Sequence, residues 1–438
     1  MHEPDAARPL TSGRVLSIAL PIVISNATVP LLGMVDTGVV GQMGEAAPIG
    51  AVGIGAVILS SIYWIFGFLR MGTSGLVAQS HGAGDGAETG AHLLRALVIA
   101  ILAGLSFIVL QAPLFRLAFW LAPASDGVET LARQYLQLRI WGAPATIALY
   151  AVTGWLIALE RTRSVLVLQL LMNGLNVLLD LWFVLGLGWS VRGVALATLI
   201  SEWSGITLGL WFARDAIRGA LRVAGLFAAD RLKRLLQVNG DIMIRSVLLQ
   251  GSFTSFMFLA AGQGDVTLAA NQVLLQFLSI VAFALDGFAF AAESLVGQAV
   301  GARRPERLRR AAWLTSQWGV GGSVGLAFLF ATAGPAIIDL LTTAPEVRSV
   351  ARAYLPWLIA APVLGIAAWM LDGIFIGATR TREMRNAMLV SVALYVPVLV
   401  LLPQLFGNHG LWAALMVLSL LRGLTLWWLY PQVEAAAR

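Results

Sequence analysis

Asn173, Asn176 and Asp180 carry the clearest chemical signal in this sequence of 438 residues. They interrupt the otherwise apolar stretch 169–185, and their spacing of three and then four residues places all of them on one face of a helix. An ionisable group within an apolar membrane helix costs about 2.5–3.5 kcal/mol to insert and usually faces a polar cavity. Asp36 has the same apolar setting near the end of the first apolar segment. Two carboxylates and two amides predict a cation site, for a proton or a metal ion; the alternative is a carboxylate that a neighbouring helix satisfies to hold the bundle together.

The composition places these residues in a membrane. Hydrophobic residues make up 58% of the chain and charged residues only 12%, whereas soluble domains carry about 25% charged residues. The mean hydropathy is +0.82. Cysteine is absent, which excludes disulfides and thiolate metal sites. The basic residues fall in short loops between apolar segments, which is the positive-inside pattern rather than a nucleic-acid-binding pattern.

Twelve apolar segments reach the length of about 20 residues that a membrane-spanning helix needs. We therefore predict an all-α polytopic protein of the cell inner (plasma) membrane. Arginines concentrate in alternate loops, so both termini are expected in the cytoplasm. The approximate spans are 14–40, 48–77, 90–112, 133–158, 164–187, 192–213, 236–262, 267–298, 309–331, 350–378, 385–406 and 408–430.

An internal repeat divides these twelve helices into two pseudo-symmetric six-helix lobes. The stretch 76–83 reappears as 295–302, and the Arg-Thr-Arg motif at 161–163 reappears at 380–382. Both offsets are 219 residues, which is half the chain. An even number of spans restores the orientation, so the lobes are parallel repeats. The predicted domains are an N-lobe (1–213), a cytoplasmic linker (214–235) and a C-lobe (236–438).

The repeat also separates scaffold from function. Asp36 corresponds to Ser255, and Asp180 corresponds to Leu399. The second lobe lacks the acidic pair, so the shared helical scaffold does not require it. This favours a specialised site in the first lobe.

The predicted depth of the polar residues is consistent with one site. Asp36 lies near the outer end of span one, Asp180 about two turns before the outer end of span five, and Thr198 about two turns into span six. All three can meet in the outer half of the first lobe. Pro21 removes a backbone donor within span one and is a candidate bend. The alternative is a tolerated, permanent bend.

A second set of charges is predicted toward the cytoplasmic side. Two arginines and three carboxylates at similar depth could pair across the lobes and form an inner gate. The alternatives are fixed ion pairs that hold the fold together and a site for lipid headgroups. These residues are Arg70, Arg245, Asp286, Glu293 and Asp372.

Several kinds of chemistry are disfavoured. The only lysine is Lys233, and no phosphate-binding Gly-x-x-x-x-Gly-Lys motif surrounds it, so we expect no ATP hydrolysis. No His-Glu-x-x-His motif is present. The stretch 262–265 matches the Gly-x-Gly-Asp pattern of intramembrane proteases, but it falls in a short outer loop and 82–85 matches equally well. We therefore expect neither an enzyme nor a cofactor.

Three further blocks resemble a known family. The stretches 66–76, 284–289 and 371–380 are similar to the multidrug and toxic compound extrusion (MATE) family, in its DNA-damage-inducible F (DinF-like) branch. The resemblance covers nearly the whole chain. It implies twelve helices in two lobes and export of organic, often cationic, compounds driven by inward H⁺ or Na⁺ flow.

The resemblance also implies roles for individual residues. Asp36, Asn176, Asp180 and Thr198 match the family's first-lobe cation site, and Pro21 matches the position where the first helix can bend. Another branch places an acidic cation site in the second lobe. Asp372 resembles one member of that set, but span seven has no clear match for its acidic partner.

The resulting hypothesis is an antiporter. Asp36 and Asp180, with Asn173 nearby, bind the incoming H⁺, or act as metal ligands if the coupling ion is Na⁺. The expected partners are small organic molecules and membrane lipid, with no nucleic acid, and the expected state is a monomer. The main alternative is a flippase for lipids or lipid-linked precursors; an intramembrane enzyme and a channel are further rivals.

Overall fold

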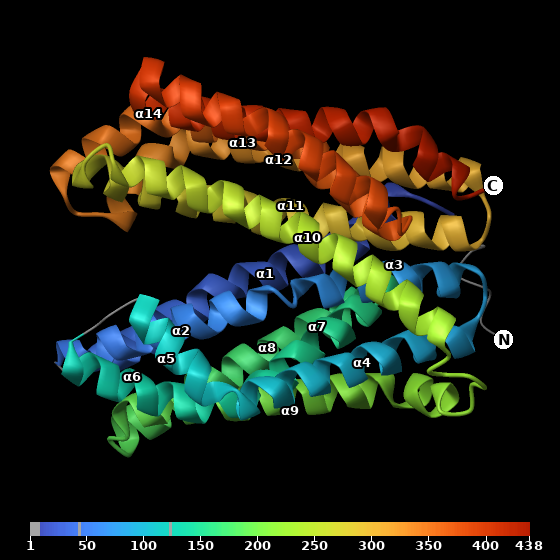
Figure 1. Ribbon diagram of the computed structural model, residues 1–438, viewed down its shortest axis with the longest axis horizontal. Helices are drawn as coiled ribbons and strands as arrows, with labels where there is room; N and C mark the ends of the chain where they lie inside the picture. The colour runs from blue at the N-terminus through green and yellow to red at the C-terminus, as the bar shows by residue number, and fades with distance from the viewer. Residues whose placement is uncertain (1–8, 43–44, 122–124) are drawn as a thin grey trace. The chain divides into compact units, whose positions relative to one another are not determined.

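The computed structural model describes residues 9–42, 45–121 and 125–438, and the regular elements in these ranges are all helical (Figure 1). The chain divides into two compact units. The first unit comprises Ile24–Val77 and Asp85–Leu235. The second unit comprises Leu236–Arg438, Ala78–Gly84 and the chain up to Val23. The all-α polytopic fold predicted from the sequence is confirmed.

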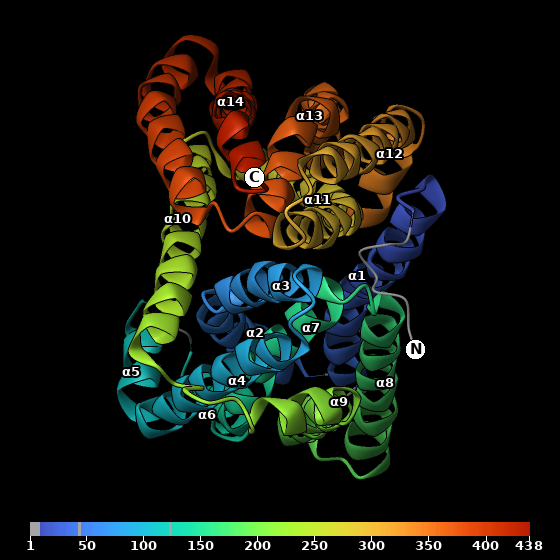
Figure 2. The same ribbon diagram turned by 90° about the vertical axis from the view of Figure 1, so that its right-hand side faces the viewer.

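The first unit is a bundle in which α9 packs against α4, α6, α7 and α8 (Figure 2). Its core is built mainly from aliphatic side chains of α2, α6 and α9, together with Tyr63, Tyr135 and the α5 residues Phe115 and Phe119. Its helices are the later part of α1 (Ser12–Gly41), α2 (Ala46–Trp64), most of α3 (Gly67–Gly82), α4 (Gly86–Val109), α5 (Gln111–Leu121), α6 (Asp126–Arg139), η2 (Ile140–Gly142), α7 (Ala143–Ala158), α8 (Thr162–Asp180), η3 (Leu181–Gly186) and α9 (Ser190–Ala220).

The second unit centres on α11 and α13, which pack against each other and against α12. Its helices also include the start of α1 and the end of α3. The remaining bounds are α10 (Ala229–Ala261), α11 (Asp265–Gly301), α12 (Pro305–Leu341), α13 (Pro345–Gly377) and α14 (Thr381–Ala435).

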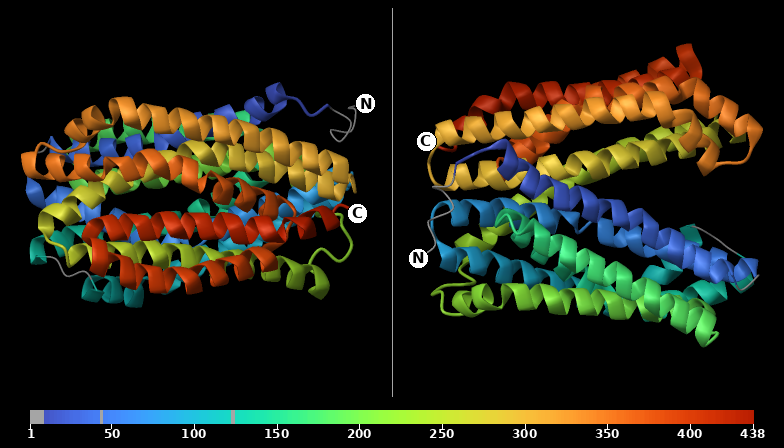
Figure 3. Two further views of the ribbon diagram at one scale, coloured as in Figure 1. Left: turned by 90° about the horizontal axis from the view of Figure 1, so that it is seen from above. Right: turned by 180° about the vertical axis from the view of Figure 1, so that it is seen from behind.

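Helix α14 contains two membrane crossings. Its 55 residues would extend about 80 Å as one straight helix, far beyond a hydrocarbon core of about 30 Å. The helix breaks at Gly407, where φ is 53° and ψ is −133°. The chain then doubles back. Gly410 packs directly against the backbone of Leu402, so closely that a methyl group at Gly410 would collide with the Leu402 carbonyl. Figure 3 shows the two limbs side by side.

Asparagine side chains hold this reversal in place. Asn408 follows the break and exchanges two hydrogen bonds with Asn271 on α11, at 2.7 and 3.0 Å. The described residues form 11 helical segments that are long and apolar enough to cross a membrane. Because one of them holds the spans predicted at 385–406 and 408–430, the structure contains the twelve crossings expected from the sequence.

Two predicted spans differ in detail from the structure. The segment predicted as one helix over 48–77 is interrupted at Ile65–Phe66, which separates α2 from α3. Gly67 follows this turn, and glycine is a poor helix former. The segment predicted over 133–158 begins earlier, at Asp126, and tightens to a 3₁₀ turn over Ile140–Gly142. Hydrophobic length alone does not report such local breaks.

The backbone repeats with the period seen in the sequence. A residue other than glycine rarely adopts a positive φ, yet the structure has three pairs of positive-φ residues at an offset of 219. They are Gly84 (76°) and Arg303 (52°), Glu160 (57°) and Thr379 (50°), and Gly188 (70°) and Gly407 (53°). The two halves therefore share their turns as well as their helices, which confirms the pseudo-symmetry.

Close helix contacts at glycine repeat in the same way. A Cβ atom on Gly154 would collide with the backbone carbonyl of Arg70, and one on Gly373 would collide with the carbonyl of Ala289. Both members of each contact are related by the offset of 219. Small residues let membrane helices approach closely, so these glycines set the spacing between α3 and α7 and between α11 and α13.

Replacing Gly373 with alanine should therefore lower the stability of the purified protein by about 1–3 kcal/mol, because the added methyl group must push two helix backbones apart. The control is Gly321→Ala, since Gly321 lies on α12 with nothing within 4 Å of its Cβ position. This control should leave the apparent melting temperature unchanged or raise it. Equal melting temperatures for the two variants would contradict the packing argument.

Candidate cation site

Three helices of the first unit supply the predicted site. Asp36 lies on α1, Asn176 and Asp180 on α8, and Thr198 on α9. Helix α8 ends at Asp180 and continues as the wider π-helical segment η3. Such π-helical turns often occur at functional sites. Asp180 is thus the residue at which the helix changes its winding.

The Asn176 side chain bridges the two carboxylates. We assign its amide nitrogen to the side facing them, where it donates to Asp36 Oδ1 at 3.1 Å and to Asp180 Oδ2 at 3.2 Å. Its oxygen then accepts from the Thr198 hydroxyl at 3.1 Å. The reverse orientation would place the amide oxygen against two acceptors. The four predicted residues therefore form one hydrogen-bonded cluster.

The two carboxyl groups therefore lie on either side of one amide, close enough to interact directly with each other. Two ionised carboxylates repel each other in a low-dielectric setting, and a direct hydrogen bond between them would need a proton on one of the pair. Asp180 is fully buried, and its Oδ1 atom has no hydrogen-bond partner among the described residues. The arrangement can hold one shared proton, and the remaining oxygen is available to a further donor or to a cation.

Asn173 is positioned differently from the other predicted residues. Its Nδ2 donates to the Thr28 hydroxyl of α1 at 2.7 Å, and its oxygen accepts from Gln169 at 3.0 Å. Thr28 lies about two turns before Asp36 on the same helix. Asn173 therefore links α8 to α1 beside the cluster. Its hydrogen bonds are to Thr28 and Gln169 rather than to the two carboxylates.

A buried ion pair adjoins the cluster. Arg139 on α6 donates to Glu202 on α9 at 2.6 Å, and each side chain is 9% exposed. Both charges act electrostatically on Asp36. Gly142 leaves room for the pair, because a methyl group there would collide with the Glu202 carboxylate. Tyr135 lies close to Arg139 and completes this polar layer.

The sequence offered only a partial signal for this ion pair. Arg139 and Glu202 each stand out as a single charge in an apolar span, but no periodicity links residues that are 63 positions apart.

The second unit has its own buried charge cluster. Arg245 and Arg422 both donate to Oδ2 of Asp372, the latter at 2.6 Å, and all three residues are buried. Arg422 was not among the predicted residues. One carboxylate between two guanidinium groups leaves an excess positive charge at this point.

The other predicted gate residues lie on two helices. Asp286 and Glu293 are on α11 of the second unit, and Arg70 is on α3 within the first unit. Their joint role as an inner gate stays a prediction.

Helix α1 remains helical through Pro21. The chain passes from the second unit to the first between Val23 and Ile24, just after this proline. The helix that carries Asp36 therefore belongs to both units, and the backbone position that lacks an N–H donor lies close to the boundary.

Comparison with known proteins identifies the family of this arrangement. The MatE family model matches residues 21–182 and 242–401, one stretch in each half of the repeat. The chain belongs to the MATE transporter family. It is 41% identical over 422 residues to "DNA damage-inducible protein F" of Escherichia coli, covering 93% of this chain and 90% of that one. It is 28% identical over 340 residues to "Probable multidrug resistance protein NorM" of a Synechocystis species, covering 74% and 70%.

Solved MATE structures have the same fold. A structure described as the outward-facing conformation of a multidrug resistance MATE family transporter superposes with a TM-score of 0.88 at 18% identity, covering 98% of this chain and 97% of that one. The bent form of the Vibrio cholerae MATE transporter VcmN gives 0.87 at 19% identity and covers 97% of each chain. The resemblance inferred from the sequence blocks is therefore confirmed. The protein is a multi-pass membrane transporter of a family that moves small organic compounds using ion gradients, and the family consists of transporters rather than enzymes.

Removing one partner of the Arg139–Glu202 pair should destabilise the protein. Arg139→Leu leaves the buried Glu202 carboxylate without its counter-charge, at a cost of about 3–5 kcal/mol. The double variant Arg139→Leu/Glu202→Leu should recover most of the loss, as measured by thermal unfolding in detergent. Arg218→Leu is the control, because its pairing with Asp215 is exposed and contributes little. A double variant as unstable as the single one would contradict this view.

Proposed function

We propose that this MATE protein is a secondary active multidrug efflux antiporter that exports organic, often cationic, compounds in exchange for protons by alternating access. The supporting observation is that one amide, Asn176, bridges the carboxyl groups of Asp36 and Asp180 within an apolar helical bundle. Because two adjacent carboxylates in a low-dielectric setting hold a shared proton more tightly than one carboxylate in water, the arrangement favours H⁺ as the coupling ion. Na⁺ is the alternative, with the same carboxylate and amide oxygens as ligands.

The proton and the substrate compete in this mechanism. With the proton bound, the carboxyl pair carries one negative charge fewer, and its two groups hydrogen-bond to each other. After the proton leaves, two carboxylates in a low-dielectric setting repel each other and attract a cationic substrate. Coupling requires that proton and substrate favour opposite-facing states, since only differential affinity shifts a conformational equilibrium.

Helix α1 is the proposed mechanical link. Asp36 lies on the part of α1 that belongs to the first unit, and Pro21 lies just before the boundary between the units. A change in the contacts that Asn176 and Asp180 of α8 make with Asp36 would move α1. Pro21 lacks a backbone hydrogen bond, so α1 can bend there. We further propose that the lobes 1–213 and 236–438, joined by the linker 214–235, move against each other in a monomer whose termini are both in the cytoplasm.

A lipid flippase is less well supported. That function calls for a wide cationic cavity built around Arg70 and Arg245. Arg245 is instead buried and bonded to Asp372. The geometry therefore favours the antiporter.

Efflux of a lipophilic cationic dye from proteoliposomes should respond to an imposed pH gradient and should be lost in Asp180→Asn, because the amide cannot exchange a proton. A Na⁺ gradient imposed separately should drive little efflux. Asp215→Asn is the matched control, since the Asp215 side chain is 79% exposed. Undiminished coupled efflux by Asp180→Asn would disprove the carboxylate mechanism, and efflux driven only by Na⁺ would replace the proton with Na⁺.

The neighbouring ion pair should tune this coupling with a predictable sign. In Glu202→Gln the positive charge of Arg139 is uncompensated, so it favours the ionised form of Asp36 and the proton is held only at lower pH. In Arg139→Gln the negative charge of Glu202 favours the protonated form, so the proton is held to higher pH. The pH of half-maximal efflux should fall in the first variant, rise in the second and return toward the wild-type value in the double variant. If both single variants lost efflux rate but their pH of half-maximal efflux did not move in opposite directions, the pair would be only structural.

A further inference from the structure

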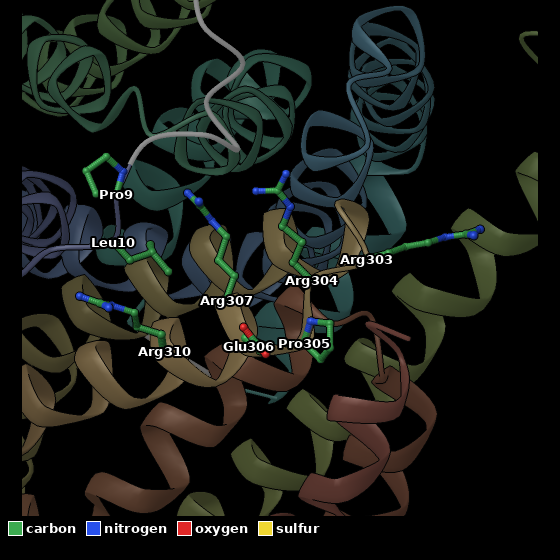
Figure 4. A pocket seen from close by; sticks show the side chains of 8 residues that line it. All are labelled: Pro9, Leu10, Arg303, Arg304, Pro305, Glu306, Arg307 and Arg310. Atoms are coloured by element: carbon green, nitrogen blue, oxygen red, sulfur yellow. The ribbon is translucent and has the colours of Figure 1, made fainter.

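A basic pocket lies in the second unit at the start of α12. Its volume is about 740 Å³, and its lining contains four arginines and one glutamate. In Figure 4, Arg304 and Arg307 project in the same direction from the first turn of the helix. The nearby Arg309 is paired with Glu434 at 2.7 Å and does not line the pocket. The lining residues are Pro9, Leu10, Arg303, Arg304, Pro305, Glu306, Arg307 and Arg310.

The internal repeat allows the start of α12 to be compared with the equivalent start of α4 in the first unit. The turn before α12 corresponds to the turn before α4, with a positive φ at Arg303 and at Gly84. In the first unit Asp85 caps α4 by accepting from the backbone N–H of Glu88 at 2.9 Å. The position equivalent to Asp85 is Arg304, which makes no side-chain cap.

The charge is inverted at two positions on one shared backbone. Arg304 replaces the capping aspartate, and Arg307 stands where α4 has Glu88. A helix N-terminus favours negative charge, and α4 receives it from its own side chains. At α12 Glu306 is the one acidic residue of the first turn, and the arginines on both sides of it add positive charge to a helix end that is already positive. The positive-inside rule accounts for arginines in this loop, but it does not account for their gathering around a pocket or for the loss of the acidic cap.

We propose that this pocket binds the phosphate-bearing headgroup of an anionic phospholipid such as phosphatidylglycerol. Guanidinium groups bind phosphate through paired hydrogen bonds, and basic pockets between membrane helices hold anionic headgroups. A lipid source fits better than free phosphate because α12 is an apolar candidate span that starts at the pocket. Leu10 and Pro9 add apolar lining, and Trp313, which is 65% exposed, lies about two turns further along α12.

The proposal does not depend on the direction of transport or on the coupling ion. A headgroup in this pocket would contact the segment that leads into α1 as well as the start of α12. It would therefore connect two elements of the second unit that meet there.

Native mass spectrometry of the delipidated protein can test the site by comparing phosphatidylglycerol with phosphatidylcholine. The wild type should retain phosphatidylglycerol in preference, and each arginine removed from the pocket should weaken this preference by about fivefold. The pocket variant is Arg303→Gln/Arg307→Gln/Arg310→Gln. The matched control removes three exposed arginines of the inter-lobe region, Arg214→Gln/Arg218→Gln/Arg222→Gln, and should keep the preference.

A second variant guards against a folding defect. Arg304→Asp/Arg307→Glu gives α12 the cap pattern that α4 already uses, so the helix should form while the phosphatidylglycerol preference is lost. The proposal is overturned if the wild type shows no preference, or if the control loses as much as the pocket variant. It is also overturned if inorganic phosphate displaces phosphatidylglycerol at equal concentration, which would identify the ligand as a soluble anion.

Discussion

The enclosure of two carboxyl groups side by side within a membrane helical bundle is the constraint on which the first unit depends. Asp36 and Asp180 cannot both be ionised in this setting without strong repulsion. The two N–H groups of Asn176 offset part of this repulsion, and the proton proposed to bind here would remove the rest. The adjacent Arg139–Glu202 pair adds no net charge, because the two side chains form an ion pair at 2.6 Å. The protonation of the acidic pair is thereby tied to how closely α1 and α8 approach.

The surrounding packing makes the spacing between α1 and α8 depend on a few polar contacts. The Asn173–Thr28 hydrogen bond joins α8 to α1 at one level, and the hydrogen bond from Asn176 to Asp36 joins them at another. Gly142 leaves room for the neighbouring ion pair, because a methyl group there would collide with Glu202. Loss of the shared proton would therefore change the contact between α1 and α8 at the carboxyl pair. The Asn173–Thr28 hydrogen bond would still keep the two helices aligned. Such an element can shift between two arrangements rather than deform continuously.

The two halves show what the scaffold requires and what function adds. Turns and helix-contact glycines recur at an offset of 219, whereas the buried acidic pair and the charges that begin α4 and α12 do not. The first half carries the acidic pair where the second has Ser255 and Leu399. The second half carries arginines at the start of α12 where the first has acids. Divergence in charge on a shared backbone is therefore the most informative feature of this chain.

Much of this account could be predicted from the sequence, and the remainder has a physical explanation. The spans, the repeat and the acidic cluster follow from hydropathy, self-similarity and helical spacing. The Arg139–Glu202 pair and the role of Arg422 depend on which helices become neighbours, which a period of 3.6 residues does not encode. The break between α2 and α3 depends on local turn geometry within an apolar run. The orientation of Asn176 depends on partners from three helices.

The most direct test of the central claim is an infrared titration of carboxyl protonation in the purified protein. The wild type, Asp36→Asn and Asp180→Asn would be compared from mildly acidic to mildly alkaline pH. The account predicts one protonated carboxyl group in the wild type that is lost as the pH rises, and a displaced or absent titration in both variants. A wild-type signal that persists unchanged in both variants, or no titrating carboxyl group at all, would contradict it.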